Sequence, residues 1–175
     1  MASAWHCVRQ VGLSLEGDPY WAGRFGELAR SSGVGAGRLH VAVFVEPFLR
    51  FVLEGRKTLE SRFSVRRSAP FGRVRPGDVV LLKRSGGPVV GVCEVSDVWF
   101  YRLNPGTWSE IRREFSEALC VQDPDFWRAR ERASFATLMA IGHARRLRPV
   151  AFPKRDRRGW VIVGAEGRST GLADE

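Results

Sequence analysis

A nine-residue stretch at 54–62, EGRKTLESR, carries three charged side chains whose types could form a binding site: Lys57, Glu60 and Arg62. A cation on either side of a carboxylate would keep that carboxylate ionised. An ionised carboxylate is a poor general base at neutral pH, but it accepts well from the exocyclic amine of a nucleobase. The trio therefore predicts a recognition site rather than a catalytic one, with the two cations meeting phosphate or a carbonyl edge. The alternative is a structural salt bridge that closes the end of the preceding helix.

The residues around this trio predict how it is held. The segment TLESRFS, 58–64, alternates as a β-strand does, which puts Thr58, Glu60 and Arg62 on one face. Lys57 stands at the corner between helix and strand, where it can lean over the same face. We therefore include Thr58 among the candidate ligand-binding residues.

Two further segments are strongly basic. Seven lysines and arginines lie between Arg62 and Arg84 and seven between His143 and Gly159, each against a single acid. We expect these loops to flank one cleft and follow a phosphate backbone, although two solvated loops are the alternative. The predicted nucleic-acid contacts are Arg66, Arg67, Arg73, Arg84, Arg145, Arg146, Arg155, Arg157 and Arg158.

Two aromatic residues are candidates to stack a base. Trp99 and Tyr101 share a face of a predicted strand by alternation, and exposed aromatic rings stack on unpaired bases. Packing in the core is the alternative for this pair.

Composition agrees with a nucleic-acid partner. The chain has 175 residues, with 28 Lys and Arg against 19 Asp and Glu, a formal net charge of +9. Most of the cations are arginines, whose planar fork fits phosphate and stacks on bases. A GC-rich genome would also enrich arginine, so charge alone does not decide the function.

Other classes of protein are disfavoured by the sequence. There is no apolar run of about 18 residues, so no membrane span is expected. The N-terminal residues lack the apolar core of a secretory signal, which favours a cytoplasmic location. The cysteine and histidine spacings fit neither a disulfide framework nor a metal site, so no metal or cofactor is expected.

The chain divides into three predicted parts. Residues 1–37 form a helical extension with a Gly/Ser linker, 38–164 form the main domain, and 165–175 are a disordered tail. Asp18-Pro19 predicts the start of the extension's helix. We expect this helix to pack on the main body, and exchange with a neighbouring molecule would give a homodimer.

The main domain reads as α+β and mostly β. Strands are predicted over 39–45, 58–64, 79–83, 89–102, 136–152 and 160–164, and helices over 46–55, 107–119 and from Asp123. A capping box of Thr107 and Glu110 is expected to begin the second helix, and a slip in alternation near Asp97 predicts a bulge. Hairpin turns dominate, so a small, mostly antiparallel β-barrel with peripheral helices fits best.

The spaced motif Gly55-x-Lys57-x-x-Glu60-x-Arg62 resembles the signature of the ASCH domain, a member of the PUA-like superfamily of β-barrels. The resemblance covers roughly 39–163 and is supported by the RPGD turn at 75–78, the strand GVCEV and the late strand WVIV. It implies a cleft beside the first helix of the barrel that faces RNA or a modified nucleotide.

Some members of this family are small amidohydrolases that act on acetylcytidine, and others are reported to cleave RNA. In the amidohydrolases the motif lysine, here Lys57, is catalytic, and the nucleophile is a threonine at the position that Glu60 occupies. Thr58 is two residues away along the strand, so that activity is not carried over. A hydrolase, either a ribonuclease or an amidohydrolase of modified nucleosides, that uses Lys57 and Glu60 with a water remains one alternative. A protein-interaction adaptor is another.

Overall fold

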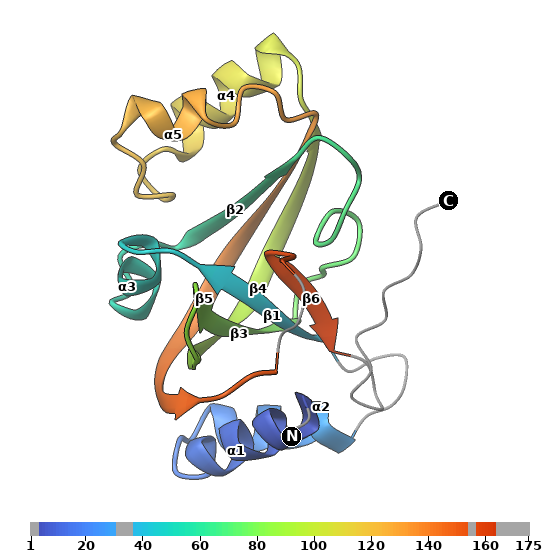
Figure 1. Cartoon of the computed structure of the whole chain (residues 1–175), viewed down its shortest axis with the longest axis vertical. Helices are drawn as coiled ribbons and strands as arrows, with labels where there is room; N and C mark the ends of the chain where they lie inside the picture. The colour runs from blue at the N-terminus through green and yellow to red at the C-terminus, as the bar shows by residue number, and fades with distance from the viewer. Residues whose placement is uncertain (1–3, 31–36, 154–156, 164–175) are drawn as a thin grey trace.

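The computed structural model describes residues 4–30, 37–153 and 157–163 (Figure 1). Arg155 and the predicted tail, 165–175, lie outside the described residues. The chain order is α1 (Ala4–Leu15), α2 (Trp21–Arg30), β1 (Leu39–Phe44), α3 (Phe48–Leu53), β2 (Leu59–Ser64), β3 (Val79–Arg84), β4 (Val89–Arg102), α4 (Pro105–Phe115), α5 (Pro124–Arg128), β5 (Phe135–Val150) and β6 (Trp160–Val163). None of the described helices is long and apolar enough to cross a membrane.

All six strands form one sheet in the order β2-β5-β4-β3-β1-β6. The β1–β3 pair is parallel and the other four pairs are antiparallel. The sheet curls into a half-barrel whose edge strands are β2 and β6, with helices around it (Figure 1). The predicted class, α+β with a mostly antiparallel barrel and peripheral helices, is confirmed.

The two longest strands, β4 and β5, form the backbone of the sheet and bend it. Their pairing shifts register at three places, one of them between Val95 and Asp97, where the bulge was predicted. Gly91 lies where the bent sheet meets α3. A Cβ at this position would stand 2.5 Å from Leu53 Cδ2 and 3.1 Å from the carbonyl oxygen of Arg145, so a larger residue would displace the end of the Leu53 side chain and crowd the backbone of β5.

The predicted start of α4 is wrong. The helix begins at Pro105, and its cap is Asn104, whose side chain accepts from the backbone N–H groups of Gly106 and Thr107. Thr107 completes this capping box from the third helical position, so it is not the cap itself. Proline at the first helical position has no N–H to satisfy, which is why the helix starts before Thr107.

The N-terminal residues contain two helices, where only the second was predicted. Asp18 caps α2 as expected and accepts from the N–H groups of Tyr20 and Trp21. Both helices pack on the sheet, and their apolar side chains share one buried cluster with β1, β3 and β4, including Cys7, Val11, Trp21, Val41 and Leu81. The division at 37/38 stays a prediction.

Two pairs of helices lie at the two ends of the half-barrel, and α3 lies between them (Figure 1). α4 and α5 cover the ends of β2, β4 and β5 through a cluster that includes Leu59, Ile111 and Leu138. α1 and α2 lie at the opposite end. α3 lies beside the start of β2, with Leu49 and Val52 buried against the sheet. The segment 54–62 therefore runs between α3 and the cover formed by α4 and α5.

Candidate nucleic-acid interface

The structure brings Lys57, Glu60 and Arg62 together as one chain of charges. Lys57 Nζ lies 3.4 Å from Glu60 Oε2, and Arg62 Nε lies 2.9 Å from Glu60 Oε1. The Arg62 N–H is not aimed closely enough at this oxygen for a hydrogen bond, so the contact is an ion pair. Glu60 and Arg62 share a strand face, as alternation predicted.

Lys57 is held inside the protein. Its side chain is 3% exposed, and Nζ donates to the carbonyl oxygens of Leu59 at 2.6 Å and Leu119 at 3.1 Å. Burial lowers the pKa of Lys57, and the charge of Glu60 partly opposes this shift. Two carbonyls and one carboxylate occupy the three donors of an ammonium. Lys57 therefore positions Glu60 and anchors β2 to the segment after α4.

Arg62 fastens the open side of the half-barrel. From β2 its Nη2 donates to the carbonyl oxygen of Val43 at 3.0 Å, and its Nη1 donates to that of Gly159 at 3.3 Å. Its guanidinium carbon lies 5.0 Å from the Phe44 ring and 5.3 Å from the Trp160 ring. The side chain is 21% exposed. Arg62 therefore acts as a clasp, meaning that it links β2 to β1 and to the residue before β6, and it is also part of the accessible surface.

A third cation, Arg130, lies near this chain of charges. Arg130 follows α5, and its Nη1 donates to the carbonyl oxygen of Phe126 at 2.7 Å while its guanidinium lies 3.7 Å from the Phe126 ring. Burial lowers the pKa of Arg130, the charge of Glu60 raises it and that of Arg62 lowers it. Arg130 therefore lies within electrostatic range of the trio.

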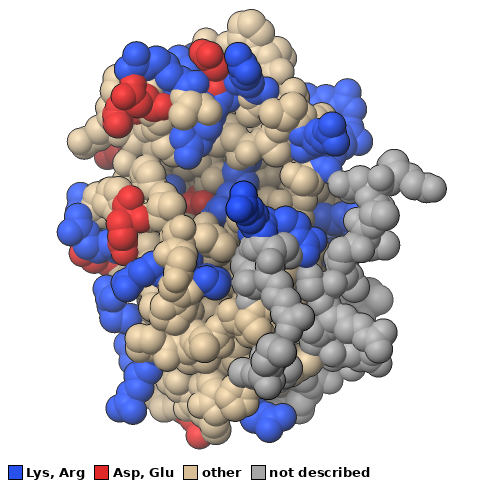
Figure 2. All heavy atoms as spheres, viewed as in Figure 1, with Lys and Arg blue, Asp and Glu red and all other residues tan. Residues whose placement is uncertain are grey.

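The surface is hollowed where these elements meet. Figure 2 shows a recess between the end of the molecule that carries α4 and α5 and the part that carries α3, with basic and acidic side chains inside it. Lys57 Nζ lies 5.4 Å from the Phe48 ring, and that ring lies 5.7 Å from the Phe126 ring. Glu60, with 8% of its side chain exposed, is thus nearly enclosed by its partners.

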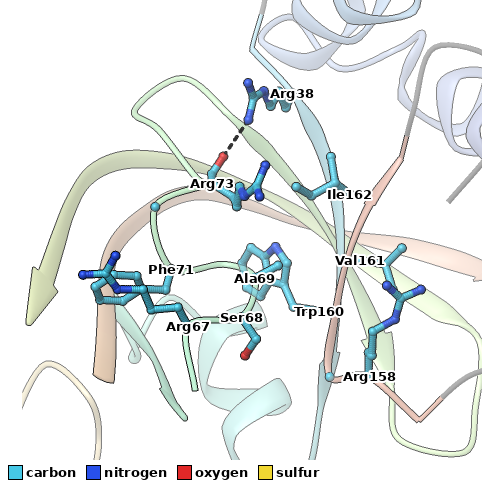
Figure 3. Close-up of a pocket in the computed structure, with 12 residues that line it drawn as sticks. Arg38, Arg67, Ser68, Ala69, Phe71, Arg73, Arg158, Trp160, Val161 and Ile162 are labelled. Atoms are coloured by element: carbon cyan, nitrogen blue, oxygen red, sulfur yellow. Dashed lines mark hydrogen bonds between the residues drawn. The ribbon is translucent and has the colours of Figure 1, made fainter. Parts of the chain in front are cut away.

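A separate cavity of about 690 Å³ lies next to Arg62 (Figure 3). It shares Gly159 and Trp160 with the contacts of Arg62. Its described lining contains four arginines and no acid, and it includes two aromatic residues, Phe71 and Trp160. The arginines are Arg38, Arg67, Arg73 and Arg158. Arginines of the two basic segments therefore meet at one cavity, and their role in binding a phosphate backbone stays a prediction.

The other predicted arginines that the structure describes do not line this cavity. Arg84 and Arg146 line a different hollow of about 410 Å³, together with Glu46 and Arg50. Arg145 Nε lies 3.3 Å from Asp18 Oδ2, which ties β5 to the start of α2. Arg66 and Arg157 are exposed, and a role for them in binding stays a prediction.

Of the two residues predicted to stack a base, Trp99 lies at the surface and Tyr101 packs against the core. Trp99 is 38% exposed, and its ring lies 6.1 Å from that of Phe115 on α4. Tyr101 packs against the cluster beneath α4 and α5, which is the core alternative. Thr58 is exposed, and its carbonyl oxygen accepts from the N–H of Ile141. Their roles in binding stay predictions.

Several residues of the site had no local signal in the sequence. Arg130 lies within electrostatic range of Glu60, although the two residues are far apart in the sequence. Phe71 and Trp160 come together in one cavity from segments that are far apart in the chain. In the sequence, the basic loop before Trp160 indicated a cleft at this place. It did not indicate that Phe71 and Trp160 would form part of its wall.

A buried network fixes the back of this cavity. Trp160 Nε1 donates to His40 Nδ1 at 3.0 Å, and His40 Nε2 lies 2.8 Å from Asp78 Oδ2. An indole N–H can only donate, so His40 accepts at Nδ1 and carries its proton on Nε2. Asp78 also accepts from the backbone N–H groups of Arg38 at 2.6 Å and Arg75 at 2.9 Å. Trp160 and Arg38, which both line the cavity, are thereby held to one carboxylate.

The adaptor alternative calls for an apolar groove without basic lining. A groove of about 420 Å³ lies between α1 and α2, with Trp5, Leu13 and Phe25 among its apolar residues. Arg9 and Glu16 also line it, so the groove is not free of charge.

Comparison of the sequence with protein-family models and with curated proteins finds no match. Among solved structures, ASCH from Zymomonas mobilis matches with a TM-score of 0.59 at 13% identity, over 74% of this chain and 90% of that one. Two single-substitution variants of the Zymomonas mobilis protein match with TM-scores of 0.60 and 0.57, both at 12% identity. The first match covers 77% of this chain and 94% of the variant, and the second covers 74% of this chain and 93% of the variant. The chain therefore has the ASCH-domain fold.

Proposed function

We propose that this protein binds single-stranded nucleic acid, with RNA as the expected form, and holds one base in the recess above Glu60. The base would donate its exocyclic amine to the Glu60 carboxylate, as cytosine does to a carboxylate in other complexes. Arg62 and Arg130 would meet the carbonyl edge or the phosphate of the same nucleotide.

The observation that carries this proposal is the set of contacts made by the Glu60 carboxylate. Its carboxylate has one cation at each oxygen, at 3.4 Å and 2.9 Å. A carboxylate offers about four acceptor positions, so two cations leave capacity for a ligand's N–H. A fixed and partly unfilled acceptor beside aromatic rings and guanidinium groups suits a base with an amino group.

The same geometry favours binding over hydrolysis by Lys57 and Glu60. A general base needs a lone pair that faces the substrate. Lys57 donates to two carbonyl oxygens and pairs with Glu60, so its ammonium is committed to the protein. Glu60 is held between Lys57 and Arg62, with one cation at each carboxylate oxygen.

Fluorescence anisotropy with a labelled single-stranded RNA octamer of mixed sequence, at low salt, tests this proposal. The variant Glu60→Gln keeps the shape of the side chain and removes the charged acceptor. We expect it to weaken binding about tenfold or more, since one good contact to a base edge is worth about 1–3 kcal/mol. Glu54→Gln is the matched control, because Glu54 pairs only with exposed Arg50 and Arg56 among the described residues.

Wild-type binding with an unchanged Glu54→Gln variant and a weakened Glu60→Gln variant would support the proposal. The absence of RNA binding by the wild-type protein at low salt would overturn it, as would equal affinity of Glu60→Gln and wild type. If Glu60→Gln does not fold, competition on the wild-type protein replaces it. Free cytidine should then displace the octamer at lower concentration than free uridine.

A further inference from the structure

We propose that the arginine cavity lined by Arg38, Arg67, Arg73 and Arg158 is a phosphate subsite for the nucleotide next to the base at Glu60. This inference rests on the proposed function and makes it more specific: the ligand is an oligonucleotide rather than a free nucleoside.

The cavity and the recess are neighbours because they share a wall. Gly159 lines the cavity, and its carbonyl oxygen accepts from Arg62 Nη1. Trp160 also lines the cavity, and its ring lies 5.3 Å from the Arg62 guanidinium. Arg62 in turn contacts Glu60. A strand whose base lies above Glu60 therefore passes the guanidinium of Arg62 to enter the cavity.

The charge of the cavity suits phosphate. Its described lining residues include four arginines and no Asp or Glu. Within the described parts of the chain, no carboxylate pairs with Arg38, Arg67 or Arg73, although ten other ion pairs are formed there. The guanidinium groups of Arg38, Arg67 and Arg73, which no described carboxylate pairs with, attract an anion, and their fork geometry fits phosphate oxygens. Figure 3 shows Arg73 beside Ile162 and Arg158 beside Val161.

The size and the aromatic wall of the cavity suit a nucleotide rather than a bare anion. Its volume of about 690 Å³ falls in the range of small-molecule sites. The Phe71 ring lies 5.3 Å from that of Phe100, which is 42% exposed, and the Arg67 guanidinium lies 5.9 Å from the Phe71 ring. A base attached to the bound phosphate would thus find exposed aromatic surface beside the cavity.

The cavity is also preorganised by contacts within the protein. Asp78 holds the backbone of Arg38 and Arg75, and Arg38 Nη1 donates to the carbonyl oxygen of Arg73 at 3.1 Å (Figure 3). The Trp160 wall is fixed through His40 to the same carboxylate. A preformed site loses less conformational entropy on binding.

NMR titration of the wild-type protein with cytidine, the dinucleotide CpC and a cytidine octamer tests the inference. We expect CpC to bind at least tenfold tighter than cytidine. The double variant Arg73→Gln/Arg158→Gln should bring the CpC affinity down to that of cytidine while cytidine binding stays unchanged. For the octamer, the slope of log affinity against log salt should decrease by about 0.7 for each phosphate that the variant no longer neutralises.

The matched control is Arg9→Gln/Arg113→Gln, which removes the same charge from exposed positions on α1 and α4. It should leave the CpC affinity within twofold of wild type. Equal affinity of wild type for CpC and cytidine, with no effect of Arg73→Gln/Arg158→Gln, would overturn this inference and leave the proposed function standing. Failure of all three ligands to bind would overturn both.

Discussion

Arg62 in the edge strand β2 donates to the carbonyl oxygen of Gly159, which lies immediately before β6, the opposite edge strand. The same oxygen accepts from the N–H of Val43 at 2.9 Å. One side chain thus joins both edges of the half-barrel and also contacts Glu60. The position of the Glu60 carboxylate and the closure of the sheet therefore depend on the same residue.

Arg62→Lys should destabilise the fold even though it keeps the charge. A lysine ammonium cannot reach Glu60, Val43 and Gly159 together, because it lacks the planar fork of arginine. We expect a loss of about 1–2 kcal/mol in the free energy of unfolding, less than for a fully buried ion pair because Arg62 is 21% exposed. Urea unfolding measures this loss.

The control for that experiment is Arg50→Lys. Arg50 and Glu54 have side chains that are 57% and 41% exposed, so their pair contributes little and the variant should stay within about 0.5 kcal/mol of wild type. Equal urea midpoints for Arg62→Lys and wild type would contradict the role of Arg62 as a clasp.

Lys57→Met should be more damaging. Methionine fills similar space, but it leaves the carbonyl oxygens of Leu59 and Leu119 without their donor and removes one of the two cations beside Glu60. Removing one partner of a buried, hydrogen-bonded pair costs about 3–5 kcal/mol. Thermal and urea unfolding should both show this loss, and a change below about 1 kcal/mol would mean that Lys57 is not a structural anchor.

Asp78→Asn should destabilise the network behind the arginine cavity. Asp78 is 1% exposed and receives three hydrogen bonds, from the backbone N–H groups of Arg38 and Arg75 and from His40. The amide group of asparagine would turn an N–H toward at least one of these donors, at a cost of about 2–3 kcal/mol. Asp97→Asn at an exposed position of β4 is the control, and equal stability of the two variants would contradict this assignment.

Alkaline pH should weaken the fold through Cys7. Burial raises the pKa of the Cys7 thiol from 9.0 to about 11. Above pH 9 the thiol ionises in the unfolded chain but stays protonated in the folded one, so the unfolded state binds fewer protons. The free energy of unfolding therefore falls as pH rises, by at most about 1.4 kcal/mol per pH unit for this thiol.

Urea unfolding of wild type and Cys7→Ala between pH 9 and 11 isolates this contribution. Burial also raises the pKa of Cys93, and the lowered pKa of Lys57 acts in the opposite direction, because neutral Lys57 is tolerated better in the folded state. Both effects persist in the variant and cancel in the comparison. Parallel curves for the two proteins would show that Cys7 does not ionise differently in the folded and unfolded chains.

Local patterns in the sequence predicted much of the fold. Alternation in 58–64 placed Glu60 and Arg62 on one face, and their side chains are 2.9 Å apart. β4 occupies the whole predicted range, 89–102, and the bulge lies where the alternation slips. These features depend on neighbours within a few residues. The first helix also had such a signal, since Cys7, Val11 and Leu15 recur at a spacing of four, but the polar residues between them concealed it.

Burial of the trio could not be predicted from the same patterns. Lys57 is covered because the carbonyl oxygen of Leu119, 62 residues away, comes to 3.1 Å from Nζ. Arg130 likewise comes within electrostatic range of Glu60 from a segment far from it in the sequence. Such contacts depend on tertiary packing. The sequence shows which side chains are charged but not which of them the fold encloses.

The most direct test of the account compares the affinities of the wild-type protein for single-stranded octamers of cytidine and of uridine. The two bases differ where cytosine has an amino donor and uracil has a carbonyl acceptor. A carboxylate at the floor of the recess should favour the cytidine octamer by about tenfold or more at low salt, and Glu60→Gln should remove the preference. Equal binding of the two octamers by the wild-type protein would contradict base recognition by Glu60.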